Sequence, residues 1–167
     1  RVGSGISNVD LQAARDLGIA VRSTPNGPTQ AVAELTIGAL LSLLRMIPVM
    51  DQALHRGEWS KKIGTQLEGK TVAIIGFGRI CRRVAELLEP FRVKILVVDP
   101  HMSHDPADGF NRLPLEKALP QADIITLHSS GEECLLGPHE FTIMKTGAVL
   151  LNVARGGLID EECLVKA

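Results

Sequence analysis

An α/β fold built on a doubly wound parallel sheet is the architecture that this sequence predicts, and two observations lead to that prediction. Short apolar runs alternate along the chain with turns and helical segments, which is the rhythm of a parallel sheet covered by helices. One apolar run leads into a glycine-rich turn and then into a helix, at residues 76–81. The length of 167 residues, 45% of them hydrophobic, is sufficient for a buried core.

The apolar runs indicate six candidate strands, all in parallel order, and five of them can be given bounds. The run 93–98 is nearly continuously apolar, as expected of a strand that is buried on both faces of a sheet. The five bounded strands are 19–23, 71–75, 93–98, 124–128 and 148–152.

Helical segments separate most of these runs. Asp10 can cap the first of them, and Pro90 stops the one that follows the glycine-rich turn. The expected helices are 11–17, 30–47, 79–89 and 138–144, with a further helix beginning near Asp160.

The helix expected at 30–47 is apolar on nearly every side, since 12 of its 18 residues are apolar. Such a helix needs cover on two sides. The sheet can cover one side, and a second subunit or another part of the protein can cover the other. Pro48 is expected to end or kink this helix, and the more polar stretch 51–69 is expected to cross over to the next strand.

Composition excludes several classes of function. A net charge of −1, with 3% aromatic residues and no Tyr, gives neither a basic face nor a stacking platform for nucleic acid. The three cysteines, Cys81, Cys134 and Cys163, show no CxxC spacing, so we expect no disulfide, no metal site and a cytoplasmic location. Polar residues interrupt the apolar stretch 31–47, which therefore predicts a buried helix and no membrane span.

The most specific local signal is the turn Gly76-Phe77-Gly78-Arg79-Ile80, which closes an expected strand and opens an expected helix. Asp99 follows Gly76 by 23 residues, at the end of the next strand. This combination is the fingerprint of a Rossmann-type dinucleotide site. Gly76 permits the turn, Gly78 lets a pyrophosphate approach, and the N–H groups of Arg79 and Ile80 face it.

The same fingerprint predicts which cofactor binds. A carboxylate at Asp99 can accept hydrogen bonds from ribose hydroxyls and would repel a 2′-phosphate, so NAD is favoured over NADP. Cys81 stands where the fingerprint has a third small residue, and we expect a slightly displaced helix with binding retained. A nucleotide-free turn, with glycines for geometry alone, is the less favoured alternative.

A second signal is Arg155, which follows an expected strand and precedes Gly156-Gly157. In an open parallel sheet, ligands bind at the carboxyl ends of the strands. A guanidinium offers a rigid fork that matches a carboxylate, so Arg155 could hold an acidic substrate. Taken alone, an arginine before two glycines is more often a solvated loop residue.

The segment Asn152-Val153-Ala154-Arg155-Gly156 closely resembles the signature of the D-isomer-specific 2-hydroxyacid dehydrogenases. Within that family, the stretch from Val32-Ala33-Glu34-Leu35 to Leu44-Arg45 is most similar to the phosphoglycerate dehydrogenase branch. The resemblance covers nearly the whole chain. Other segments that carry it are Val2-Gly3-Ser4-Gly5, Asn8-Val9-Asp10, Ala33-Glu34-Leu35-Thr36, Gly57-Glu58-Trp59 and Leu67-Glu68-Gly69-Lys70.

The resemblance implies an oxidoreductase that transfers hydride between NAD and a D-2-hydroxy acid, with a place in serine biosynthesis. It implies that residues 1–167 are the NAD-binding domain alone, truncated at both ends, with the substrate domain outside the chain. It also implies a homodimer formed through the helix 30–47. Arg155 corresponds to the family's substrate-orienting arginine. The cofactor contacts that the resemblance implies are Arg79, Ile80, Asp99, His128, Ser129, Val153, Ala154 and Arg155.

The chain departs from the family pattern in two places. Ser130 stands where the family often has Pro, and the loop 131–134 is shorter than usual, which puts the cofactor contacts of that loop in doubt. The family's acid–base pair, a Glu and a His, lies downstream of the last helix, so the chain alone is expected to bind NADH without turnover. His128 is more consistent with a cofactor-edge or structural role than with catalysis. His101 and His104 are expected in a surface loop.

Two other functions fit the same residues. A dehydrogenase-like binding protein of the corepressor type senses NAD without metabolic turnover, and a relative such as formate dehydrogenase has different chemistry. The sequence does not name the 2-hydroxy acid.

Overall fold

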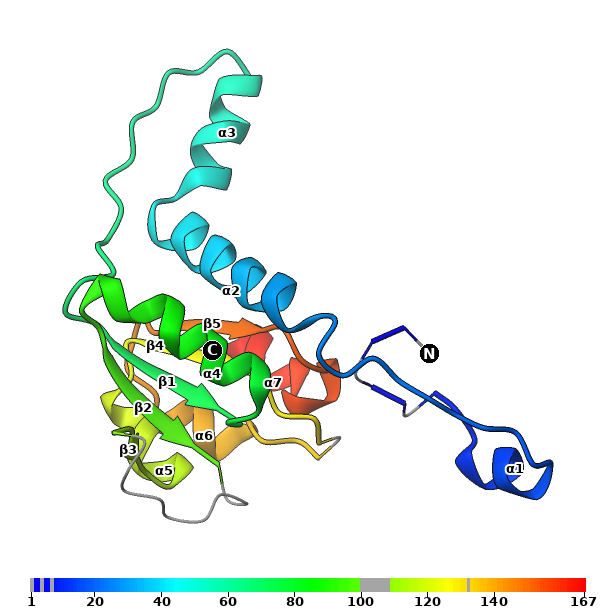
Figure 1. The fold of residues 1–167 in the computed structure, drawn as a ribbon. Coiled ribbons are helices and arrows are strands. Elements are labelled where there is room, and N and C mark those ends of the chain that lie inside the picture. The colour runs from blue at the N-terminus through cyan, green and yellow to red at the C-terminus, as the bar shows by residue number, and fades with distance from the viewer. Residues whose placement is uncertain (1, 4, 7, 100–108, 132) are drawn as a thin grey trace.

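The computed structural model describes residues 2–3, 5–6, 8–99, 109–131 and 133–167. In this part of the chain one five-stranded parallel sheet forms the centre of the molecule, with the order β3-β2-β1-β4-β5 (Figure 1). Ser4, His101 and His104 lie outside the described residues. The bounds of the strands are β1 Thr71–Ile75, β2 Lys94–Val98, β3 Asn111–Arg112, β4 Ile124–Leu127 and β5 Val149–Asn152.

Successive strands are added on one side of β1, β2 and then β3, and afterwards on its other side, β4 and then β5, as in a doubly wound fold. β1 pairs with β2 on one side, Ile75 opposite Val98, and with β4 on the other, Ile75 opposite Leu127. β5 continues the sheet beyond β4. The predicted fold class is therefore confirmed, and the carboxyl ends of β1, β2, β4 and β5 meet at one edge.

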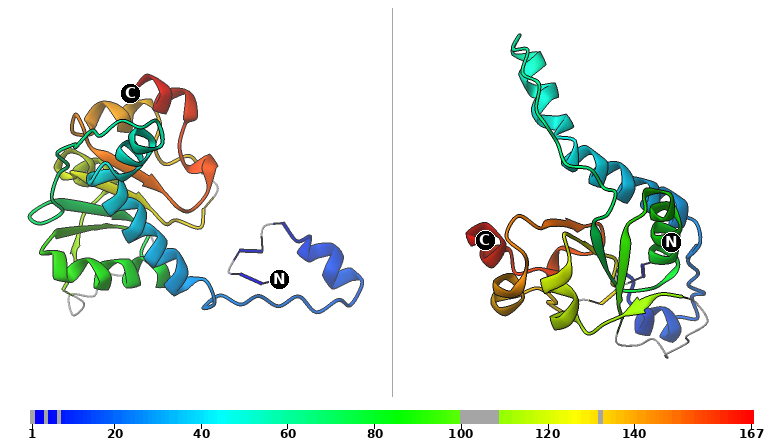
Figure 2. Two further views of the ribbon diagram at one scale, coloured as in Figure 1. Left: turned by 90° about the horizontal axis from the view of Figure 1, so that it is seen from above. Right: turned by 90° about the vertical axis from the view of Figure 1, so that its left-hand side faces the viewer.

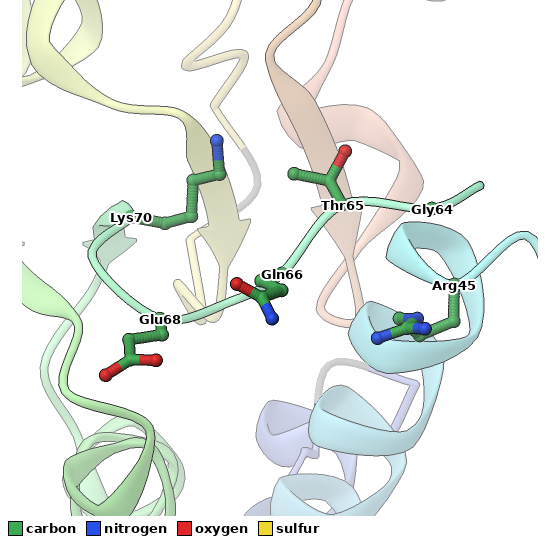
Figure 3. A pocket seen from close by; sticks show the side chains of 6 residues that line it. All are labelled: Arg45, Gly64, Thr65, Gln66, Glu68 and Lys70. Carbon is green, nitrogen blue, oxygen red and sulfur yellow. The ribbon is translucent and has the colours of Figure 1, made fainter.

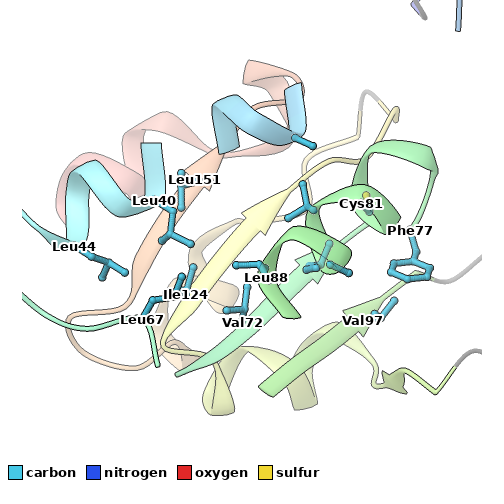
Figure 4. Packing of buried hydrophobic residues seen from close by; sticks show 14 residues of the cluster. Leu40, Leu44, Leu67, Val72, Phe77, Cys81, Leu88, Val97, Ile124 and Leu151 are labelled. Carbon is cyan, nitrogen blue, oxygen red and sulfur yellow. The ribbon is translucent and has the colours of Figure 1, made fainter. Parts of the chain in front are cut away.

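Two hydrophobic cores cover the two faces of the sheet, because successive strand residues point to opposite faces. Val72 and Ile74 belong to the core under α2 and α4, where Leu40 and Leu88 are also buried (Figure 4). Alternate residues of β1, such as Ala73, belong to the core on the other face.

The helices are α1 Leu11–Asp16, α2 Thr29–Leu44, α3 Ile47–His55, α4 Arg79–Leu88, α5 Leu115–Ala118, α6 Pro138–Ile143 and α7 Glu161–Lys166. Short 3-10 turns lie at η1 Glu89–Phe91, η3 Leu119–Gln121 and η4 Gly156–Leu158. α2 packs along α4 on one face of the sheet, and α5 packs beside β2. Asp10 caps α1 and Asp160 caps α7, each by accepting a backbone N–H three residues on.

The predicted helix 30–47 is two helices. α2 ends at Leu44, Met46 adopts a left-handed conformation with φ 56°, and α3 begins at Ile47 with Pro48 in its first turn. Pro48 thus lies at the start of the second helix rather than at the end of the first. Proline is tolerated there because the N–H groups of a first helical turn have no partner within the helix, so the N–H that proline lacks is not missed. The axes of α2 and α3 differ by 67°.

α3 and the segment that follows it project away from the sheet as an arm, residues 45–66 (Figures 1 and 2). The arm returns where the Thr65 N–H donates to the Leu44 carbonyl at 2.8 Å, which bonds one of the last carbonyls of α2. A side chain at Gly64 would collide with the backbone of Arg45. The crossover predicted for 51–69 is partly helical, because α3 extends to His55.

The predicted strand 19–23 is wrong. This segment is extended but pairs with no strand of the described sheet, and it lies in the N-terminal region that projects from the body together with α1 (Figure 1). The run is apolar in sequence, yet Ile19 is exposed. The two-residue strand β3 was not predicted, since Asn111 and Arg112 carry no apolar signal.

No single helix among the described residues is long and apolar enough to cross a membrane. The bent pair α2 and α3 passes that test of length and composition only when the two helices are taken together.

Candidate functional site

The glycine turn closes β1 and opens α4, as predicted. Gly76 has φ 87°, and a Cβ there would lie 3.0 Å from the Ser129 backbone nitrogen and 3.2 Å from the His128 carbonyl carbon. Only glycine therefore fits, because the end of β4 presses directly against the turn. A Cβ at Gly78, by contrast, would meet no atom within 4 Å.

The start of α4 is open to a ligand. Gly78 is its N-cap and contributes no side-chain hydrogen bond, so the N–H groups of the first turn lack a side-chain acceptor. These N–H groups lie at the positive end of a ten-residue helix, and both Gly78 and Arg79 are exposed. An anion can be held there by backbone donors alone.

Asp99 follows β2 and reaches across to the glycine turn. Its Oδ2 accepts the Phe77 N–H at 2.8 Å. Phe77 is buried, packs edge-on against Phe110 with centroids 4.8 Å apart, and carries the Arg82 guanidinium over its ring at 4.7 Å. Asp99 thus ties the turn of β1 to the end of β2.

His128 and Ser129 follow β4 and are half-buried. The His128 N–H donates to the Ile75 carbonyl at 2.9 Å, which continues the sheet pairing one residue past the strand. His128 Nε2 lies 2.9 Å from Thr126 Oγ1. Burial lowers the pKa of His128 to about 4, so the ring is neutral at physiological pH.

The loop after β5 is held by Asn152. Its side-chain amide donates to the Arg155 carbonyl at 2.7 Å, and its Oδ1 accepts the Ala154 N–H at 3.0 Å. Val153 and Ala154 are half-buried, whereas Arg155 is exposed. The Arg155 guanidinium donates to the Ala154 carbonyl at 3.0 Å, and a Cβ at Gly5 would lie 2.5 Å from its Nη2.

The structure thus brings the predicted residues to one edge of the sheet, in three groups. Gly76 contacts His128 and Ser129, and Phe77 joins Gly76 to Asp99. Val153, Ala154 and Arg155 form the third group at the end of β5, where Arg155 lies beside Gly5.

Sequence reasoning gave no supporting role to Thr126, Asn152 or Gly5. Asn152 was noted only as part of the family signature, and the Thr126 contact follows from the two-residue spacing that puts Thr126 and His128 on one face of β4. The Gly5 contact joins segments 150 residues apart and leaves no local signal.

The residues fit a dinucleotide. The open first turn of α4 matches a pyrophosphate, the space at Gly78 admits it, and the Asp99 carboxylate lies at the end of the neighbouring strand, where a ribose would be expected. Cys81 is 1% exposed in the core beneath the turn (Figure 4), and burial raises the pKa of its thiol to about 12. Cys81 is therefore a packing residue, and its sulfur fits under the helix.

Two hollows lie at the opposite, amino edge of the sheet. One of about 520 Å³ is lined by Arg45, Gly64, Thr65, Gln66, Glu68 and Lys70 (Figure 3). The other, of about 210 Å³, includes Asp123 and Lys145. The Thr71 N–H and Lys145, 2.9 Å away, hold the pKa of Asp123 below its usual value. These hollows are separate from the glycine turn.

Nothing in the described part of the chain indicates a metal site, since no group of three or more His, Cys, Asp or Glu side chains converges there. The three cysteines are free, with Cys134 exposed.

Comparison with known proteins identifies the family. The model of the D-isomer specific 2-hydroxyacid dehydrogenase NAD-binding domain matches residues 37–167. D-3-phosphoglycerate dehydrogenase of Rattus norvegicus is 41% identical over the whole chain, and that of Methanocaldococcus jannaschii is 37% identical. The chain spans about a third of the length of each of these relatives, 33%.

Solved structures of two enzymes share the fold of this chain. The apo structure of D-lactate dehydrogenase from Escherichia coli has a TM-score of 0.89 at 32% identity, covering 98% of this chain and 54% of that one. A glyoxylate reductase from Paecilomyes thermophila has a TM-score of 0.87 at 34% identity, covering 99% and 52%. The predicted cofactor, NAD, is confirmed by the family match. This chain belongs to the NAD-binding domain family of the D-isomer specific 2-hydroxyacid dehydrogenases.

Proposed function

We propose that this chain is the cofactor-binding domain of an enzyme that transfers hydride between NAD and a D-2-hydroxy acid. One observation carries the proposal: the glycine turn, Asp99 and the loop 152–155 follow the carboxyl ends of β1, β2 and β5 in one sheet. Since ligands of open parallel sheets bind at this edge, a dinucleotide and an acidic substrate can meet there.

Different residues of the chain bind different parts of NAD. The N–H groups at the start of α4, at Arg79 and Ile80, hold the pyrophosphate above Gly76 and Gly78. Asp99 accepts hydrogen bonds from the adenosine ribose.

The other end of the cofactor lies against the ends of β4 and β5. His128 and Ser129 border it on the β4 side, and Val153 with Ala154 border the nicotinamide on the β5 side. When bound, the nicotinamide supplies the carbon that accepts or donates hydride.

Arg155 orients the substrate. Its exposed guanidinium forms a bidentate pair with the substrate carboxylate and polarises the oxygen on the neighbouring carbon. His128 is unsuited to take the hydroxyl proton, because a group with a pKa of about 4 is a weak base at neutral pH. We therefore place the acid–base pair outside this chain.

D-3-phosphoglycerate is the first substrate to test, because the curated relatives with 35–41% identity over the whole chain carry the name D-3-phosphoglycerate dehydrogenase. A place in serine biosynthesis and a cytoplasmic location are part of the proposal, the latter resting on three free cysteines. The comparisons give no support to the corepressor alternative.

A homodimer through α2 completes the proposal. α2 buries one side against α4, while Leu35 and Leu43 on its other side remain exposed. The arm adds exposed apolar side chains at Ile47, Val49 and Leu54. Exposed apolar residues gathered on one projecting element are typical of an interface between subunits.

The test is to assay the full-length protein with NAD or NADP and a panel of D- and L-2-hydroxy acids that includes 3-phosphoglycerate. We expect NAD-dependent oxidation of a D-isomer. Arg155→Ala should lower kcat/KM by about a hundredfold or more, since a bidentate charged pair is lost. Arg15→Ala, which removes an exposed arginine from α1, is the matched control. Oxidation of the hydroxy acids that does not depend on NAD, or full activity in Arg155→Ala, would overturn the proposal.

A further inference from the structure

Thr126 is one of two buried polar residues in the described core, at 2% exposure, and it lies in β4 two positions before His128. Residues at this spacing share one face of a strand. Ile124, two positions earlier, belongs to the core under α2 and α4, so Thr126 and His128 lie on the face of the sheet that carries the glycine turn and α4. The contact between Thr126 Oγ1 and His128 Nε2 measures 2.9 Å.

The direction of this hydrogen bond follows from the chemistry of the hydroxyl. A buried hydroxyl must place its proton on an acceptor, and His128 Nε2 is the partner of Thr126 Oγ1 among the described residues. Thr126 therefore donates to Nε2, which must be unprotonated. In a neutral imidazole the remaining proton is then on Nδ1.

The backbone of His128 lies against the glycine turn, and its ring lies on the face of the sheet that carries α4. The His128 carbonyl carbon lies 3.2 Å from the position of a Cβ on Gly76, and the His128 N–H is fixed on the Ile75 carbonyl. Desolvation favours the uncharged ring. A neutral donor can bind an oxygen of the dinucleotide without repelling the positive charge of oxidised nicotinamide.

We propose that Thr126 is a positioning residue that fixes the tautomer and the orientation of His128, so that His128 presents Nδ1–H as a hydrogen-bond donor to an oxygen of the bound dinucleotide. This inference rests on the proposed function, because it assigns a device to the same NAD site. It adds a residue that touches neither the cofactor nor the substrate.

The experiment uses the full-length protein and two readouts. The first is nitrogen-15 NMR of the histidine rings without cofactor, with His128 assigned from a His128→Asn variant. We expect His128 to be protonated on Nδ1. In Thr126→Val, which keeps the shape and removes the hydroxyl, we expect a mixture of tautomers, and Thr126→Ser should restore the Nδ1 form.

The second readout is the Kd for NADH. Loss of the oriented donor should weaken binding about fivefold in Thr126→Val, and Thr126→Ser should recover most of that loss. Thr36→Val is the matched control, because Thr36 is equally buried but donates to the Val32 carbonyl in its own helix. It should leave both the Kd and the His128 spectrum unchanged.

The outcomes separate the two proposals. Protonation of His128 on Nε2 in the wild type, or an unchanged Kd in a folded Thr126→Val, would overturn the role of Thr126. A wild-type protein that shows the Nδ1 form yet binds no NADH would instead overturn the proposed function. The wild-type spectrum decides the tautomer even where the valine variant fails to fold.

Discussion

The absence of a side chain at Gly5 leaves the room that the Arg155 guanidinium occupies. A Cβ at Gly5 would lie 2.5 Å from Arg155 Nη2, and that distance is shorter than any contact a real Cβ makes. The guanidinium is the far end of a flexible side chain, so it would swing aside at little cost to stability and leave its present position.

Gly5→Ala is therefore expected to raise KM for the hydroxy acid about tenfold while KM for NAD stays within twofold, since a misplaced guanidinium loses one arm of its carboxylate pair. Steady-state kinetics with each substrate varied would measure this. The matched control is Gly137→Ala, where the new Cβ makes an ordinary contact of 3.5 Å. Equal effects on both KM values would contradict the assigned contact.

The buried His128 ring predicts how stability depends on pH. Its pKa in the folded protein, about 4, lies below the ordinary value of 6.5, so the unfolded chain binds more protons between those two values. Stability is therefore complete above pH 6.5 and falls as the pH drops towards 4, by up to about 3 kcal/mol.

Urea unfolding between pH 4 and 7 measures this slope, and His128→Asn should flatten it. Asp123 also has a lowered pKa, and its contribution is lost in the same direction but at still lower pH. An identical slope in the asparagine variant would assign the dependence to other groups.

At the scale of elements, the left-handed residue Met46 divides the apolar helix and turns α3 outward. Leu43, 50% exposed near the end of α2, is then left without cover in the single chain. Leu43→Glu is expected to convert a dimer into a monomer, because a carboxylate at the centre of an apolar interface is desolvated without a partner.

Sedimentation of the full-length protein distinguishes the two states. Gln121→Glu, which adds the same charge at an exposed position of η3 on the other face of the sheet, should remain dimeric. A dimeric Leu43→Glu, or a monomeric wild type, would exclude an interface through α2.

Elements were predictable where a local pattern decides them. β1 and α4 follow from an apolar run, a glycine turn and a helical stripe, and Asp99 follows from its spacing to that turn. The run 19–23 misled because β pairing needs a neighbouring strand, which no local pattern supplies. The site residues that were missed, Thr126 and Gly5, act through contacts that only the assembled fold creates.

At the scale of the whole molecule, cofactor binding should stabilise the fold by mass action. NADH at 100 times its Kd adds about 2.7 kcal/mol, which is about 5–10 °C in Tm for a domain of this size. Thermal unfolding should show that shift with NADH and a smaller one with NADPH.

Gly78→Val sharpens the same measurement. A Cβ at Gly78 meets no atom within 4 Å, and the backbone there has an ordinary φ of −78°, so the apo Tm should stay within a few degrees. The NADH shift should disappear, since the side chain occupies the approach to the helix N-terminus. A retained shift would place the pyrophosphate elsewhere.

The bond between Asp99 and the Phe77 N–H has a consequence for anyone who wishes to change the coenzyme preference. One oxygen of the carboxylate that we propose to discriminate against a 2′-phosphate also accepts the N–H of the glycine turn. Replacing Asp99 by an apolar or basic residue would remove the repulsion of the phosphate and the acceptor of the Phe77 N–H in the same step. An exchange of coenzyme therefore calls for a replacement that keeps an acceptor there, such as Asn, or for a second substitution that supplies one.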